Sequence, residues 1–240
     1  MKLTKPAEHM TVSELAGYID HSVLKPQFTL QEVREQITAG IRFGCKTVCI
    51  NPANLPVAQE LCKGSATGIC VTCDFPFGAS STESKVAQAE IILRNNTKIH
   101  TVDEIDMVSN YGLIRSGEWT AFGNDIKAVA DAVHKSGASI KVILETDALT
   151  LDEIAKASDA ACTAGADFVK TSTGFYTEGE VKGATTEVVK VMLDAVHGRC
   201  KVKGAGSIRT QEHFFELINM GIDRMGIGYR STPVVLGYMQ

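Results

Sequence analysis

Short apolar runs alternate with longer amphipathic segments along this 240-residue chain. The runs are rich in valine, isoleucine and cysteine. The segments between them repeat apolar residues every three or four positions, as helices that cover a sheet do. This alternation is typical of successive βα units with a parallel sheet. We predict strands at residues 18–24, 47–51, 69–75, 104–109, 140–145, 168–171, 201–205 and 224–228.

The predicted helices carry start and stop signals. A hydroxyl residue followed three positions later by Glu predicts a capped start at Thr29, Ser80 and Thr150. Two apolar stripes follow, made of Val33, Ile37 and Ile41 and of Leu151, Ile154, Ala155 and Ser158. Just before six of the strands stand glycines that we expect to close the preceding helix in left-handed geometry: Gly44, Gly68, Gly137, Gly165, Gly198 and Gly221.

The regular spacing favours one closed α/β structure. Eight units of roughly 25 to 35 residues, with no linker or composition break, predict a single (β/α)8 TIM barrel over residues 1–240. An open doubly wound sheet is the alternative, although it rarely needs eight regular units. In a barrel of this kind the active site lies at the carboxyl ends of the strands.

Composition narrows the classes of partner. A net charge of −4 and a pI near 5.9 argue against a broad nucleic-acid surface. We expect neither a signal peptide nor a membrane span, because no apolar run is long enough.

The seven cysteines are too scattered for a disulfide framework and favour a reducing cytoplasm. Cys70 and Cys73 form a C-x-x-C, but on a strand they point to opposite faces, so we predict no metal site there.

The predicted strand ends are unusually polar. They carry Asp20, His21, Cys49, Asp74, Asp106, Glu145, Lys170, Lys203, Gly226 and Gly228. Two lysines, Lys170 and Lys203, fall on consecutive strands about 4.8 Å apart. Like charge and burial both disfavour the ammonium form, so one amine is expected to be neutral near pH 7. Such an amine is the nucleophile of Schiff-base chemistry, with Asp106 and Asp20 placed to relay protons. The alternatives are a lysine that reaches solvent or pairs with a carboxylate, and an Asp106 that serves only as an ion-pair partner.

Two loops suit an anionic ligand. Residues 203–210, Lys-Gly-Ala-Gly-Ser-Ile-Arg-Thr, place small residues after the seventh strand and before a helix, where backbone amides can bind an anion. Residues 226–231, Gly-Ile-Gly-Tyr-Arg-Ser, add a cation and an aromatic ring after the eighth strand.

The chain resembles the deoxyribose-phosphate aldolase family over nearly its whole length. The resemblance is carried, in the family's order, by YIDHSVLKP, TVCINP, FPFGASST, DEIDMV, KVILET, GADFVKTSTGF and VKGAGSIRT. It implies a class I aldolase on a TIM barrel that reversibly cleaves 2-deoxy-D-ribose 5-phosphate to acetaldehyde and D-glyceraldehyde 3-phosphate. By resemblance, Lys170 is the Schiff-base lysine, Lys203 the second lysine and Asp106 the acidic residue of the relay. Asp20, Cys49, Thr173, Gly174, Gly206, Ser207, Gly228, Tyr229 and Arg230 are implied to contact substrate.

The chain departs from the family pattern mainly at the expected phosphate end. Ser207 stands where the family commonly has a second glycine, and Gly228, Tyr229 and Arg230 replace a pair of small hydroxyl residues. Either Arg230 supplies a charge-assisted contact to phosphate, or Tyr229 fills the space and favours an unphosphorylated aldehyde. Residues 95–101 also replace the family's glycine-ended approach to the fourth strand.

Three readings therefore compete: the aldolase, a phosphosugar isomerase that uses the lysines as electrostatic clamps, and a phosphosugar sensor. The lysine provides the electron sink itself, so no metal or organic cofactor is implied. The expected partners are small aldehydes and sugar phosphates, and a homodimer or homotetramer is the expectation that the resemblance brings.

Overall fold

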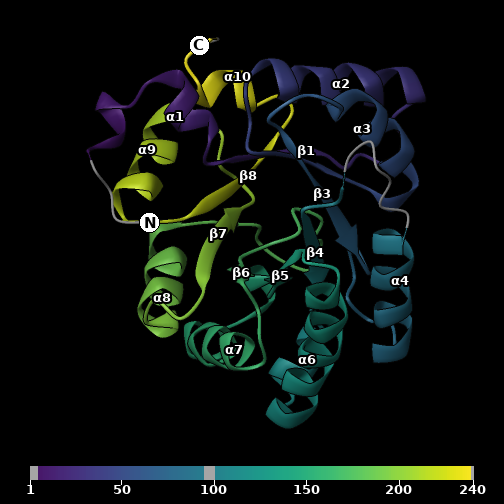
Figure 1. Ribbon diagram of the computed structural model, residues 1–240. Helices are drawn as coiled ribbons and strands as arrows, with labels where there is room; N and C mark the ends of the chain where they lie inside the picture. The colour runs from purple at the N-terminus through teal and green to yellow at the C-terminus, as the bar shows by residue number, and fades with distance from the viewer. Residues whose placement is uncertain (1–4, 95–100, 239–240) are drawn as a thin grey trace.

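The computed structural model describes residues 5–94 and 101–238. Its strands are β1 (Ile19–Val23), β2 (Thr47–Ile50), β3 (Gly68–Cys73), β4 (Glu104–Val108), β5 (Ser139–Ile143), β6 (Phe168–Lys170), β7 (Lys201–Ala205) and β8 (Arg224–Gly228). All are parallel and pair in chain order, and β8 pairs with β1 to close the barrel (Figure 1). The predicted (β/α)8 barrel is confirmed, and the open sheet is wrong.

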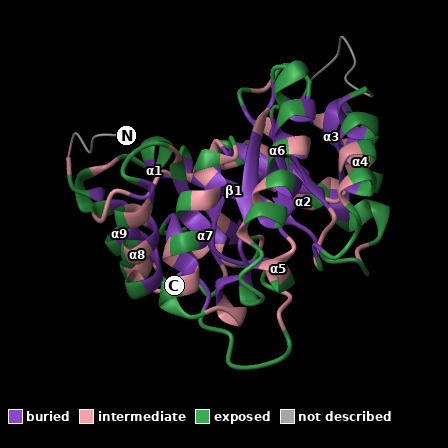
Figure 2. Ribbon diagram, turned by 90° about the horizontal axis from the view of Figure 1, so that it is seen from below, coloured by how far each residue is buried: buried purple, intermediate pink, exposed green. Residues whose placement is uncertain are grey.

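Helices surround this barrel. They are α1 (Val12–Ala16), α2 (Leu30–Arg42), α3 (Leu55–Cys62), α4 (Thr82–Arg94), α5 (Tyr111–Arg115), α6 (Trp119–Lys135), α7 (Leu151–Thr163), α8 (Thr186–Val196), α9 (Gln211–Asn219) and α10 (Thr232–Val235), with short 3-10 turns at Ala7–His9, Pro52–Asn54 and Thr146–Ala148. Figure 2 shows their exposed outer faces and the buried strands and helix faces inside. In the described part of the chain, no helix combines the length and the apolar character needed to cross a membrane.

Two of the three predicted helix starts are confirmed. Thr29 and Thr150 each accept a hydrogen bond from the amide of the Glu three positions on, and that Glu accepts one in return. The prediction for Ser80 is wrong, because α4 begins at Thr82 and the Ser80 side chain donates to Asp74 instead. A further capping box, at Thr11, was not predicted.

Five of the six predicted glycine stops are left-handed, with φ from 71° at Gly44 to 102° at Gly165. Gly68 is the exception, since it is the first residue of β3, and the left-handed glycine after α3 is Gly64. The stripe on α2 buries Val33 and Ile37 as predicted, and Ile41 is partly buried against the same core. The stripe on α7 was partly wrong: Ile154 and Ser158 are buried together with Ala157 and Ala161, whereas Leu151 is 40% exposed.

Cysteine pairing differs from the expectation. Cys162, near the end of α7, forms a disulfide with Cys200, the residue before β7. The sequence spacing of 38 residues gives no signal of this pair, which only the folding of α7 against β6 and α8 brings together. Cys70 and Cys73 do point to opposite sides of β3, since Cys70 contacts Asp106 and Cys73 contacts the carbonyl of Lys85 on α4. Of the unusual segment 95–101, residues 95–100 lie outside the described residues.

Candidate active site

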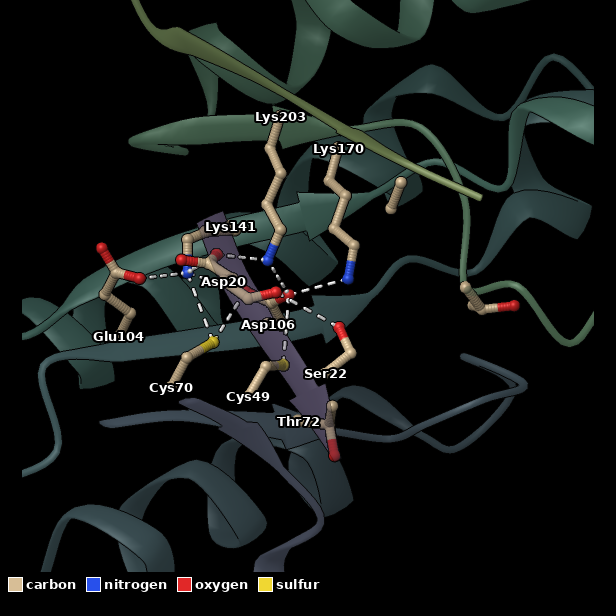
Figure 3. Close-up of polar contacts among 12 residues, drawn as sticks. Asp20, Ser22, Cys49, Cys70, Thr72, Glu104, Asp106, Lys141, Lys170 and Lys203 are labelled. Atoms are coloured by element: carbon tan, nitrogen blue, oxygen red, sulfur yellow. Dashed lines mark hydrogen bonds and ion pairs between the residues drawn. The ribbon is translucent and has the colours of Figure 1, made fainter. Parts of the chain in front are cut away.

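Three charged side chains meet inside the barrel near the carboxyl ends of its strands. Lys170 on β6 and Lys203 on β7 are register partners, and Asp106 lies across from them on β4. Both amines donate to Oδ2 of Asp106, each at 2.7 Å. Figure 3 shows the two lysines extending side by side toward that carboxylate. All three side chains are at most 3% exposed, so the structure brings together the three residues singled out for chemistry.

A second set of charges lies beside this cluster. Lys141 on β5 reaches Oδ1 of Asp106 at 2.9 Å and Oε2 of Glu104 at 2.5 Å. Asp20 on β1 lies 2.6 Å from the amine of Lys203, and its other oxygen lies 2.6 Å from Arg224 on β8. The residues belong to five strands, and alternation along each strand turns them inward.

The carboxylates determine which amines stay charged. Burial disfavours charge on Lys203, but Asp106 and Asp20 outweigh this and raise its pKa. Burial likewise opposes charge on Lys141, and Asp106 again leads the groups that raise its pKa. In return, burial would raise the pKa of Asp106, yet the surrounding ammonium groups hold it well below its usual range.

A charge count of the cluster singles out Lys170. The carboxylates of Asp20, Glu104 and Asp106 supply three negative charges, and Lys141, Lys203 and Arg224 supply three positive ones. These six groups balance without Lys170. Lys170 therefore lies outside this balance of charges, although its amine also lies 2.7 Å from Oδ2 of Asp106.

Lys170 also faces a cavity. A cavity of about 270 Å³ opens at this end of the barrel, and its lining includes Lys170, Ser22 and Leu24. Seven of the residues predicted to contact substrate also line it: Thr173, Gly174, Gly206, Ser207, Gly228, Tyr229 and Arg230. Among the described residues that line the cavity, three basic side chains accompany Lys170, namely Lys25, Arg209 and Arg230, and none is a carboxylate. The cavity thus combines a buried amine with a cationic lining.

Apart from Asp106 and Lys203, five predicted strand-end residues do not line the cavity: Asp20, His21, Cys49, Asp74 and Glu145. Asp20 and Cys49 are fully buried and do not line the cavity; Asp20 supports Lys203, and the thiol of Cys49 lies 3.9 Å from Asp106. His21 points out of the barrel, where its ring bonds Thr232 and packs near Phe43. Asp74 has φ of 51° and turns toward Ser80 and Lys85, because the chain leaves β3 at Cys73.

Among the described residues, two groups of side chains have metal-ligand chemistry. Cys49, Cys70 and Asp106 form one, and Asp20, Cys70 and Glu104 form the other. In both, a lysine already contacts the carboxylates: the amine of Lys141 lies within 3.5 Å of Asp20, Glu104 and Asp106, and 3.3 Å from the sulfur of Cys70. The donor set therefore fits lysine better than an added dication.

The loops after β7 and β8 form one side of the cavity. Gly206 and Ser207 have φ of 85° and 59°, so Ser207 adopts a conformation that favours glycine, at the position where the sequence departs from the family. Gly183 packs closely on Gly206. A Cβ added to Gly183 would lie 2.4 Å from the carbonyl oxygen of Gly206, so only glycine fits at position 183. Tyr229 packs edge-on against Phe28 at 5.1 Å, and the Arg230 guanidinium lies 5.2 Å from the Tyr229 ring centre.

Sequence reasoning missed several residues of this site. Lys141 is the first residue of the KVILET motif. Alternation along β5 places it on the face opposite Ile140 and Val142, so the sequence pattern alone could have indicated that its side chain points into the barrel. Glu104 and Arg224 follow from the same alternation on β4 and β8. Lys25 and Arg209 were within quoted motifs, but only the structure shows that both line the cavity.

Comparison with known proteins gives consistent matches. Residues 15–231 match the model of the DeoC/LacD family aldolases. Deoxyribose-phosphate aldolase 1 of Staphylococcus aureus (strain MRSA252) is 41% identical over 87% of this chain and 90% of its own length. Deoxyribose-phosphate aldolase of Aciduliprofundum boonei is 40% identical over 94% of this chain and 97% of its own. The tetrameric deoxyribose phosphate aldolase of Aeropyrum pernix superposes with a TM-score of 0.81 at 26% identity, covering 94% of this chain and 91% of that one.

Proposed function

Because the chain belongs to the DeoC/LacD family of aldolases, we propose that it is a Schiff-base aldolase with Lys170 as the nucleophile. The reaction is the reversible cleavage of 2-deoxy-D-ribose 5-phosphate to acetaldehyde and D-glyceraldehyde 3-phosphate. One observation carries the assignment of the nucleophile: of the three lysines that contact Asp106, Lys170 alone is among the described residues that line the cavity. The other two are enclosed beneath it.

The chemistry follows from that position. The uncharged amine of Lys170 adds to the aldehyde carbon of the open-chain sugar, and loss of water gives an iminium ion. The C3 hydroxyl then loses its proton as the bond between C2 and C3 breaks, and the electron pair of that bond moves to the iminium nitrogen. Glyceraldehyde 3-phosphate leaves, and an enamine remains on Lys170. Protonation of the enamine at C2 and addition of water release acetaldehyde and restore the amine.

Asp106 and Lys203 are suited to the proton transfers. The Oδ2 atom of Asp106 lies 2.7 Å from both amines, so a proton can pass between Lys170 and Lys203 through one carboxylate oxygen. Asp20 and Lys141 hold this carboxylate and Lys203 in place from the enclosed side. The thiol of Cys49 donates to Oδ2 of Asp106 at 3.9 Å, and we assign it no step in the proton transfers.

The cationic lining supports a phosphorylated substrate. Arg209 lies on the loop after β7, two residues past Ser207, and Arg230 lies on the loop after β8; both line the cavity together with Gly206 and Ser207. Guanidinium groups and free amides are common phosphate ligands. Thr173, Gly174, Gly228 and Tyr229 are proposed to contact the rest of the sugar.

Trapping of the covalent intermediate tests the proposal. Incubation with acetaldehyde and borohydride should reduce the iminium and add a two-carbon unit to Lys170, found by peptide mapping. Lys170→Met should remove the label, whereas a replacement of the exposed Lys127 should keep it. Turnover that resists borohydride would favour the isomerase reading. Binding of deoxyribose phosphate without release of aldehyde would favour the sensor.

Assembly and location are further parts of the proposal. The Aeropyrum pernix relative is tetrameric, which supports a homodimer or homotetramer here; light scattering after size exclusion tests it. The five free buried cysteines support a reducing, cytoplasmic location, in which the Cys162 and Cys200 pair would be thiols.

A further inference from the structure

The first residues after β5 and β6 form a buried clamp beside the cavity. Glu145, two residues past the end of β5, has φ of 59°, a left-handed conformation that is strained for a residue with a side chain. Backbone bonds on either side fix this turn to the strand of the nucleophile: the Leu144 amide donates to the carbonyl of Lys170 at 2.9 Å, and the Thr146 amide donates to that of Thr171 at 3.0 Å. The strained turn therefore aims Glu145 at the segment that follows Lys170.

The carboxylate of Glu145 holds that segment by two bonds. It is 2% exposed, and its Oε1 accepts from the amide of Thr173 at 3.1 Å. Its Oε2 accepts from the hydroxyl of Thr173. The hydroxyl oxygen of Thr173 accepts in turn from the amide of Phe175, at 3.0 Å. A chain of three bonds thus runs from Glu145 through Thr173 to the backbone of Phe175, with the left-handed Gly174 between the two residues.

Phe175 is the last residue in this series of hydrogen bonds. Its ring lines the cavity that holds Lys170 and packs edge-on against Phe75 at 5.3 Å. It also packs on the buried cluster of Leu24, Cys49 and Cys70. The amine of Lys25 lies 5.0 Å from the centre of the ring. Phe175 is therefore an apolar wall of the cavity, and its place depends on the turn that Glu145 holds.

We propose that Glu145 is a positioning residue for the substrate: it fixes the Thr173–Phe175 turn so that Phe175 walls the cavity beside Lys170. The inference rests on the proposed function for the identity of the substrate. The contact between Glu145 and Thr173 does not touch the reacting amine. Loss of the clamp is therefore expected to loosen substrate binding more than it slows chemistry.

Kinetics on a matched set of variants tests this. Glu145→Ala should raise KM at least tenfold and lower kcat no more than threefold. Glu145→Gln keeps an oxygen for the Thr173 amide and should recover most of the lost affinity. Thr173→Val should resemble Glu145→Ala, whereas Thr173→Ser keeps the hydroxyl and should recover most of the affinity that Thr173→Val loses. Glu153→Ala removes a helix cap on the nearby α7 and serves as the control for a simple loss of stability.

A double-mutant cycle and a readout without substrate make the test independent of activity. If the two residues act as one clamp, Glu145→Ala combined with Thr173→Val should lose no more kcat/KM than the worse single variant. Glu145→Ala should also speed cleavage by a glutamate-specific protease after the exposed Glu178 or Glu180 on the same loop. Additive losses, or unchanged KM and proteolysis, would overturn the clamp. If Glu145→Ala does not fold, the Thr173→Val and Thr173→Ser pair decides by the same criteria. Absence of borohydride labelling in the wild type would instead overturn the proposed function.

Discussion

Lys170 and Lys203 donate to the same atom, Oδ2 of Asp106, and each donor lies 2.7 Å from it. A single carboxylate oxygen therefore lies between a lysine that faces the cavity and a lysine that is fully enclosed. In the proposed mechanism Asp106 therefore has two tasks, to carry a proton and to balance the buried charge. Each task leads to a separate measurable effect.

Asp106→Asn should lower kcat by about 10²-fold to 10⁴-fold, the usual contribution of an acid-base group. The amide keeps the size of the side chain but lacks the negative charge and cannot pass a proton between the two amines. Steady-state rates measured at saturating substrate check this. Asp131→Asn, on the exposed face of α6, is the control and should leave kcat unchanged. An Asp106→Asn enzyme with more than a tenth of wild-type kcat would contradict the role in proton transfer.

Lys141→Met should destabilise the fold by about 3–5 kcal/mol, because it leaves Asp106 and Glu104 buried without their shared cation. Urea unfolding at pH 7 measures the free energy of unfolding. Lys127→Met, which breaks the exposed pair with Asp131, should change this free energy very little. Equal effects of the two substitutions would mean that the buried charges are not balanced as the structure indicates.

Arg230→Ala should lower kcat/KM for the phosphorylated sugar at least tenfold more than for free deoxyribose. The guanidinium lies at the cavity mouth and can contact only the charged tail if Lys170 holds the aldehyde end. Paired assays on the two sugars measure the ratio. Arg115→Ala, on α5, removes the same charge away from the cavity and should leave the ratio unchanged. Equal losses on both sugars would remove Arg230 from phosphate binding.

Acid should destabilise the protein through His21. Burial lowers the pKa of His21 to about 4 from 6.5, so the unfolded chain binds the proton more readily. The contribution of His21 to the free energy of unfolding is fully present above pH 6.5 and is lost as the pH drops toward 4. Between pH 7 and pH 5 the loss amounts to about 2 kcal/mol. His21→Asn can still bond Thr232 but does not titrate, so its unfolding free energy should fall less over that interval. Parallel pH profiles for the two proteins would contradict this explanation.

The sequence by itself determined the architecture and pointed to the candidate reactive residues. Alternating apolar runs and amphipathic segments predicted all eight strands, because the period of apolar positions depends only on local geometry. The predictions for β7 and β8 match the structure at both ends, and each of the other six misses at least one end by one or two residues. At Asp74 and Glu145 the chain leaves the sheet through left-handed turns, which those residue types do not announce. Lys170, Lys203 and Asp106 were identifiable because charged residues are rare in strands that are buried on both faces.

Only the tertiary structure decided how these charges balance. Lys141, Glu104 and Arg224 come from separate strands, and their ion pairs exist because the closed barrel turns all of them onto one axis. The same holds for Glu145 and Thr173, which are 28 residues apart and meet because β5 and β6 are neighbours. The pattern of residue types along the chain predicts the conformation of the local turn, helix or strand. Long-range charge pairing depends on strand register and closure, which the pattern along the chain does not encode.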